Sequence, residues 1–129
     1  MKQTMLQEKY PVFVAEIGKD ETRFKTVEEI VEYLKKRIAE REKVMFLGVF
    51  DHYAHTRSIG GEIAADIVGA VDVMFCFGTT LPNPQVLAVR PRSIGIADLG
   101  DKFVISFLEA PRLEVNAIME GWIKDLRKS

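Results

Sequence analysis

The chain has 129 residues, of which 47% are hydrophobic and 29% charged, and its formal net charge at pH 7 is −1. This length fits one domain with its own hydrophobic core, and the composition is that of a folded globular protein. Because 18 basic residues are balanced by 19 acidic ones, no positive excess is present to neutralise phosphates, and nucleic acid is not an expected partner. The single cysteine, Cys76, excludes an intramolecular disulfide and is typical of a reducing compartment.

The N-terminal segment, residues 1–10, is polar and lacks the apolar stretch of a secretory signal. The longest apolar runs, Val44–Phe50 and Val73–Phe77, are much shorter than the roughly 20 residues that cross a membrane. We therefore expect a cytoplasmic protein without a membrane partner. It should form a single domain over residues 1–129, with residues 1–10 as a flexible arm or a short helix.

The first predicted elements are a strand and a helix. Pro11 opens the β-branched and aromatic run VFVAEI, which Gly18 closes and which is typical of a strand. Thr26 and Glu29 match a capping box at the start of a helix that is expected to end near Glu42. Behind the cap, apolar residues recur every three or four positions along one side of this helix: Val27, Ile30, Val31, Leu34 and Ile38.

The middle of the chain contains two apolar strands, Val44–Phe50 and Val73–Phe77, each with apolar residues on both faces. The segment 51–72 between them contains EIAADIV, which is either a helical turn or an additional strand; we predict a short helix. Further on, Asn83 is a suitable helix cap and Pro84 a suitable first helical residue, so one short helical turn is expected there.

The C-terminal part is predicted to be a hairpin followed by a helix. SIGIADL and KFVISFL flank Gly100-Asp101, a typical two-residue hairpin loop, and Pro111 begins the final helix. The element order is therefore β-α-β(4)-α, a two-layer α+β fold with two main helices on one face of an antiparallel sheet. Because the central strands are apolar on both faces, the second face needs the minor helices, a partner subunit or an apolar ligand. A homodimer is the commonest solution.

A family pattern runs through five segments of the chain: the helix TVEEIVEYLKKRIAE, a strand leading into Asp51-His52, an apolar strand ending in Phe77-Gly78, then Asn83-Pro84, and a hairpin ending near Ala110-Pro111. Together these segments resemble the bacterial domain-of-unknown-function family three-hundred-and-two, over most of the chain. The resemblance implies a TBP-like β-α-β(4)-α fold and favours a dimer, but it implies no activity. Two departures concern the site: TTLP separates Gly78 from Asn83, and the segment after Asp51-His52 is longer than in the family.

Asp51, His52 and His55 form the most notable polar cluster, directly after an apolar strand, and include both histidines of the chain. A carboxylate beside an imidazole can fix its tautomer and raise its basicity, as acid–base catalysis requires. Asp51 and His52 are therefore candidate catalytic residues of a small hydrolase or isomerase. Adjacent side chains on a strand point to opposite faces, however, so Asp51 alternatively caps the following turn while His52 makes a local hydrogen bond.

Three further side chains, Cys76, Arg90 and Arg92, each allow two interpretations. Cys76 is either a small buried hydrophobic residue or a nucleophile near His52, and His52, His55 and Cys76 would together give an incomplete ligand set for a metal. Arg90 and Arg92 are either solvated loop charges, the commoner outcome, or an anion clamp built from the fixed donors of the guanidinium groups.

The leading functional hypothesis is a dimeric cytoplasmic small-molecule-binding or sensory-type module. Its pocket is expected to hold a small, partly apolar ligand among six residues: Asp51, His52, Phe77, Gly78, Asn83 and Pro84. Two alternatives stay open, the small acid–base enzyme and a structural module whose exposed sheet face binds another chain. The sequence identifies no cofactor.

Overall fold

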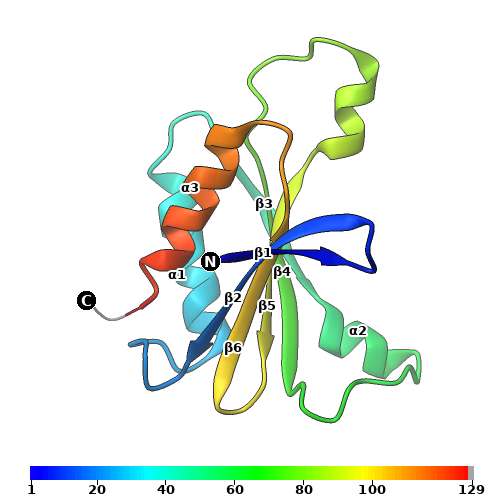
Figure 1. Ribbon diagram of the computed structural model, residues 1–129, viewed down its shortest axis with the longest axis vertical. Helices are drawn as coiled ribbons and strands as arrows, with labels where there is room; N and C mark the ends of the chain where they lie inside the picture. Colours follow the sequence, from blue (N-terminus) through cyan, green and yellow to red (C-terminus); the bar gives the residue numbers. More distant parts are fainter. Residues whose placement is uncertain (128–129) are drawn as a thin grey trace.

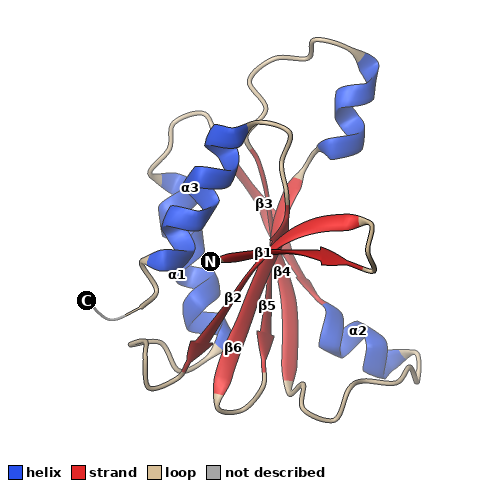
Figure 2. Ribbon diagram, in the orientation of Figure 1, coloured by secondary structure: helices blue, strands red, loops and turns tan. Residues whose placement is uncertain are grey.

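The computed structural model describes residues 1–127 and shows two layers, an antiparallel sheet and a pair of helices packed on one of its faces (Figures 1 and 2). The strands are β1 (Lys2–Leu6), β2 (Tyr10–Gly18), β3 (Met45–Asp51), β4 (Gly69–Cys76), β5 (Arg92–Asp98) and β6 (Lys102–Leu108). The helices are α1 (Val27–Ala39), α2 (His52–Ser58), the 3₁₀ helix η1 (Pro84–Val89) and α3 (Leu113–Lys124). From β2 onward, the main elements confirm the predicted order β-α-β(4)-α.

The sheet has six strands in the order β1-β2-β6-β5-β4-β3, and every neighbouring pair is antiparallel. One face of the sheet packs against α1 and α3, and this interface is the hydrophobic core. The buried side chains of the sheet include Phe75, Ile94, Ile96, Phe103 and Ile105. Within residues 1–127, no helix combines the length and the apolar character that crossing a membrane requires.

The predicted capping box forms at the start of α1. Thr26 Oγ1 accepts a hydrogen bond from Glu29 N at 3.1 Å, and Glu29 Oε1 accepts one from Thr26 N at 3.1 Å. Two otherwise unpaired backbone N–H groups are thereby satisfied, which fixes where the helix begins. The apolar side of α1 buries Val27, Ile30, Leu34 and Ile38 against the sheet.

Residues 1–10 form a strand and a turn instead of the expected arm or helix. β1 pairs with β2 from Lys2 opposite Val14 to Leu6 opposite Tyr10. The intervening turn holds Gln7 and Glu8 at positive φ, where glycine, asparagine and aspartate are the usual residues. The turn therefore lacks the residues by which a hairpin is normally found in a sequence.

The segment between β3 and β4 also differs from the prediction. Its helix is α2, at residues 52–58, whereas EIAADIV, at residues 62–68, is an irregular loop. Asp51 starts α2, because its Oδ1 accepts a hydrogen bond from Ala54 N at 2.9 Å. The helix thus begins directly at the end of β3.

The face of the sheet that points away from α1 and α3 is called the open face here. Figure 1 shows α2 and η1 on this side of the molecule. Half-buried or exposed apolar side chains from three strands lie on the open face: Val12, Val14, Met74, Val104 and Leu108. Beside it, β3 forms one edge of the sheet, and a bulge interrupts its pairing with β4 between Phe46 and Gly48.

Candidate functional site

The structure does not bring the six predicted pocket residues together. β3 and β4 run antiparallel, so Asp51 lies opposite Val71, whereas Met45 lies opposite Cys76, next to Phe77. Five residues of extended strand separate the two ends by about 16 Å. Asp51 and His52 are therefore at one end of the sheet, and Phe77, Gly78, Asn83 and Pro84 follow the other end. The prediction of one shared pocket is wrong, because the two strands run in opposite directions.

At the first end, His52 pairs with a carboxylate that the sequence did not indicate. His52 Nε2 lies 2.5 Å from Asp72 Oδ2. Phe50 lies opposite Asp72, so the residue two positions after Phe50 reaches the same side of the sheet. Asp51 is occupied in capping α2 and does not pair with His52. The available signal was an aspartate within the apolar run VDVMF, where a charge needs a partner.

Of the side chains considered as metal ligands, both histidines pack against Phe50, but Cys76 lies apart from them. The His55 ring packs against Phe50, with ring centroids 5.5 Å apart, while Cys76 lies at the opposite end of β4. Within residues 1–127, no three His, Cys, Asp or Glu side chains converge as a metal site would require.

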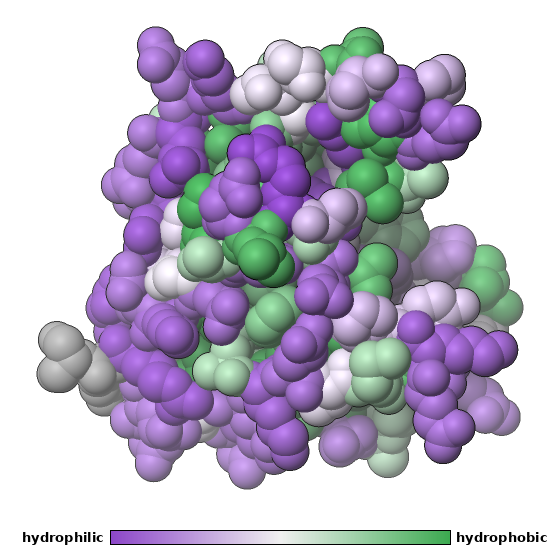
Figure 3. Space-filling view, turned by 45° about the horizontal axis from the view of Figure 1, so that its top comes forward, coloured by the Kyte–Doolittle hydropathy of each residue, from purple (hydrophilic) through white to green (hydrophobic). Residues whose placement is uncertain are grey.

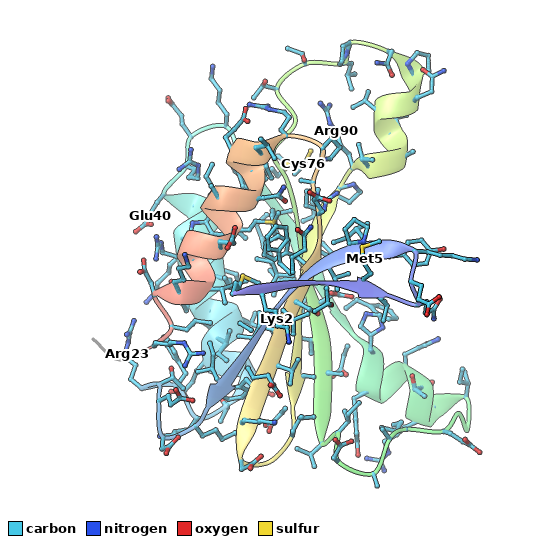
Figure 4. The ribbon with its side chains drawn as sticks, in the orientation of Figure 1. Lys2, Met5, Arg23, Glu40, Cys76 and Arg90 are labelled. Carbon is cyan, nitrogen blue, oxygen red and sulfur yellow. The ribbon has the colours of Figure 1, made fainter. Side chains whose placement is uncertain are left out.

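At the second end, a cavity of about 220 Å³ opens between η1 and the start of α3. Its walls come from the end of β4, from η1, from the start of β5 and from the segment before α3. They comprise Cys76, Phe77, Gly78, Val86, Val89, Arg90, Arg92, Ala110, Pro111, Arg112 and Val115. Figure 4 places Cys76 and Arg90 near each other where the sheet meets the start of α3, and Figure 3, with this end turned forward, shows hydrophobic surface among hydrophilic residues. We call this space the η1 cavity.

Gly78 allows a guanidinium group to lie directly against the backbone. A Cβ atom at this position would be 2.6 Å from Arg90 Nη1 and 2.7 Å from Arg90 Cζ. Arg90 Nη1 donates to Thr80 O at 2.6 Å, and Gly78 N donates to Cys76 Sγ at 3.3 Å. A glycine at this position is therefore needed for the guanidinium group of Arg90 to lie against the backbone of residue 78.

Arg92 is buried in the wall of the η1 cavity, with 8% of its surface exposed. It is the first residue of β5, opposite Phe75, so its side chain points toward the helix layer. Nη1 donates to Val89 O at 3.3 Å and Nη2 donates to Leu108 O, whereas Nε has no partner within residues 1–127. Burial lowers the pKa of Arg92. The interpretation of Arg92 as a solvated loop charge is wrong.

Residues 1–128 match the model of a family of unknown function, DUF6858. The chain belongs to this family. The predicted resemblance to family three-hundred-and-two is therefore wrong, since the order and spacing of elements on which it rested do not distinguish families with a similar two-layer layout. No curated protein and no solved structure matches the chain.

In this DUF6858 protein, one residue that sequence analysis missed holds the wall of the η1 cavity in place. Asn116 is buried in α3, and its side chain pairs with the backbone of Ala110 at both atoms. Ala110 N donates to Asn116 Oδ1 at 2.7 Å, and Asn116 Nδ2 donates to Ala110 O at 3.1 Å. The only available signal was an amide on the otherwise apolar side of the last helix.

Proposed function

We propose that this DUF6858 protein binds a small, partly apolar molecule in the η1 cavity. The observation that supports this most directly is the cavity itself, with mainly apolar walls and a few polar groups, the usual composition of a small-molecule site. An apolar cavity of about 150 Å³ accommodates benzene, so a space of about 220 Å³ has room for a ring or a short chain with a polar head. Phe77 and Gly78 line the space, and Asn83 and Pro84 begin the helix that covers it.

Binding of 1-hexanol, an uncharged probe, tests this proposal. Cys76 is the only cysteine and lines the cavity, so its alkylation by iodoacetamide, followed by mass spectrometry, reports occupancy. We expect 1-hexanol to slow this reaction and to raise the melting temperature. Val86→Trp should remove both effects by filling the cavity, whereas Leu87→Trp, on the exposed side of η1, should retain them. Retention of both effects in Val86→Trp, or equal loss in both variants, would refute the proposal.

We further propose that the protein is a cytoplasmic homodimer that associates through its open face. The support is physical: apolar side chains remain accessible there on three strands, and a second copy would remove them from water. The cytoplasmic location rests on the single free cysteine, which suits a reducing compartment. A sensory role would follow if ligand binding changed this association.

A second candidate function is acid–base catalysis by His52 with Asp72 as its carboxylate partner. The contact of 2.5 Å between His52 Nε2 and Asp72 Oδ2 favours it, because such a partner fixes the orientation of the imidazole ring. The hydrolysis of p-nitrophenyl acetate tests this candidate. We expect His52→Gln and Asp72→Asn each to lower the rate, while His55→Gln, on the same helix, leaves it unchanged. Equal rates in all four proteins would exclude the catalytic role for this class of ester.

A further inference from the structure

The η1 cavity carries a concentration of positive charge that the rest of the chain does not share. Three arginines line it, Arg90, Arg92 and Arg112, and none of its lining residues is acidic, although the chain as a whole has a net charge of −1. Arg112 is already balanced, because its Nε donates to Glu114 Oε1 at 2.8 Å. Arg90 and Arg92 form no ion pair with any carboxylate within residues 1–127.

Arg92 is the more informative of these two residues. Burying a cation away from water is unfavourable unless an anion or hydrogen bonds compensate for the lost hydration. Two backbone carbonyls, those of Val89 and Leu108, accept from its terminal nitrogens, but they supply no negative charge. Its Nε–H has no hydrogen-bond partner among residues 1–127, which is rare for a buried donor. The site is thus short of one negative charge and at least one acceptor.

Arg90 extends the same site toward the loop. Of its five N–H groups, one is used by Thr80 O, and the guanidinium plane lies against the bare backbone of Gly78. Such a fork presents two parallel donors, the geometry that matches a carboxylate. The apolar wall formed by Phe77, Val86 and Val89 belongs to the same cavity.

We infer that the ligand of the η1 cavity is an organic anion, with a carboxylate bound by Arg90 and Arg92 and an apolar body against η1. This inference rests on the proposed function, because it names the class of molecule that the cavity takes. One negative charge on the ligand supplies what the two arginines lack, and the apolar body accounts for the remaining wall. A neutral apolar molecule would fill the same space but leave Arg92 uncompensated.

The first test uses Cys76 as a probe of the local charge. Iodoacetate and iodoacetamide alkylate a thiolate in the same way, forming an S–C bond and releasing iodide, but only iodoacetate carries a carboxylate. We expect the ratio of their rates, iodoacetate over iodoacetamide, to be several-fold higher in the folded protein than in urea. Arg90→Gln and Gly78→Ala, whose methyl group displaces the guanidinium of Arg90, should lower the ratio. Arg41→Gln removes one positive charge outside the cavity and should not.

The second test compares hexanoate with 1-hexanol as protectors of Cys76 against iodoacetamide. Charge-assisted hydrogen bonds should make hexanoate effective at roughly tenfold lower concentration. In Arg90→Gln and Gly78→Ala this advantage should disappear, so that hexanoate and 1-hexanol protect at similar concentrations. Both variants change exposed or half-buried positions, so circular dichroism should show an intact fold. Arg92→Gln would leave two carbonyls unpaired and disturb folding, and it is therefore not the deciding variant.

The possible outcomes distinguish the proposed binding function from the inference that the ligand is an anion. Equal protection by hexanoate and 1-hexanol would overturn the anion inference and leave the proposed function standing, whereas protection by neither would overturn both. Acetate and inorganic phosphate should protect poorly at the concentration at which hexanoate succeeds. If either protected equally well, the apolar body would have no part in recognition and the inference would fail.

Discussion

At the scale of single residues, the η1 cavity is held open by side chains that bond to backbone atoms instead of to one another. Arg92 donates to Val89 and Leu108, Arg90 donates to Thr80, and Asn116 pairs with Ala110. Each contact fixes a piece of irregular chain relative to a strand or a helix. The loops around the cavity are therefore positioned by a small number of polar side chains.

Asn116→Ala should lower the free energy of unfolding by roughly 2–4 kcal/mol, because it leaves the N–H and the C=O of Ala110 without partners in a buried place. Urea denaturation followed by circular dichroism measures this change. Ala117→Ser is the matched control, since residue 117 is the exposed neighbour on the same helix. A loss below about 0.5 kcal/mol for Asn116→Ala would show that water or a local shift replaces both hydrogen bonds.

What sequence analysis missed in the site depends on the register of the strands and on the face to which a strand residue points. It identified His52 as a residue of interest but assigned the wrong carboxylate, since chain proximity favoured Asp51 and only the strand register shows Asp72. It named Phe77 and Gly78, which line the cavity, and it considered Arg92 for an anion clamp. It favoured a solvated loop charge for Arg92, because the burial of this residue depends on which face of β5 its side chain takes. Neighbouring residues in the sequence show neither the register of two paired strands nor the face to which the first residue of a strand points.

At the scale of elements, α1 and α3 are fastened together by a polar link beside the core. Tyr33 donates its hydroxyl hydrogen to Trp122 O at 2.6 Å, and Arg37 Nη1 donates to both the Tyr33 oxygen and Asp125 Oδ2, at 2.7 and 2.8 Å. Burial raises the pKa of Tyr33 above its ordinary value. The link thus joins the end of α3 to the middle of α1.

Tyr33→Phe should lower the free energy of unfolding by about 1 kcal/mol near pH 8, the net value of an intramolecular hydrogen bond. Because the pKa of Tyr33 is raised in the folded state, its contribution is fully present below the pKa of the unfolded chain, near 10. The contribution is lost as the pH rises through the higher folded pKa. The difference between wild type and variant should therefore stay constant from about pH 7 to pH 9 and narrow above about pH 10.

Tyr10→Phe, at an exposed position, serves as the control for this series of urea titrations. It should give the same stability as the wild type at every pH. A gap between wild type and Tyr33→Phe that did not narrow in alkali would contradict the assignment to the buried hydroxyl.

Elements were predictable where their signals were local. The capping box and the apolar side of α1 lie within a few residues of each other, and Asn83 and Pro84 mark η1 in the same way, since Asn83 Oδ1 accepts from Val86 N at 3.0 Å. β1 was missed because its turn uses Gln7 and Glu8 at positive φ. The alternative that Asp51 caps the turn after its strand is confirmed, but α2 itself was not predicted, because its cap is the last residue of an apolar strand.

At the scale of the whole molecule, the two faces of the sheet are unequal. One is covered by α1 and α3, and the open face presents Leu108, which is 48% exposed, with its apolar neighbours. Leu113, at the start of α3, is 76% exposed but lies outside that face. The same substitution, leucine to aspartate, can therefore be made once on the open face and once outside it to test the proposed self-association.

Size-exclusion chromatography with light scattering should give the mass of a dimer for the wild type and of a monomer for Leu108→Asp. An aspartate on the open face of each copy would lose its hydration on association, which opposes dimer formation. Leu113→Asp should remain dimeric. A wild-type protein that is monomeric at a concentration of about 100 μM would set aside the homodimer as a tight assembly.

The bulge in β3 affects whether strands of other molecules can add to this edge of the sheet. β3 is an outer strand whose exposed side chains include Met45, Leu47 and Phe50, and only its last residue, Asp51, is charged. A straight strand of this composition would be a template for strand-by-strand addition and hence for fibrils. The extra residue between Phe46 and Gly48 breaks the regular spacing of backbone donors and acceptors along that edge. The bulge therefore makes this apolar edge a poorer template for the addition of further strands than a straight strand of the same composition would be.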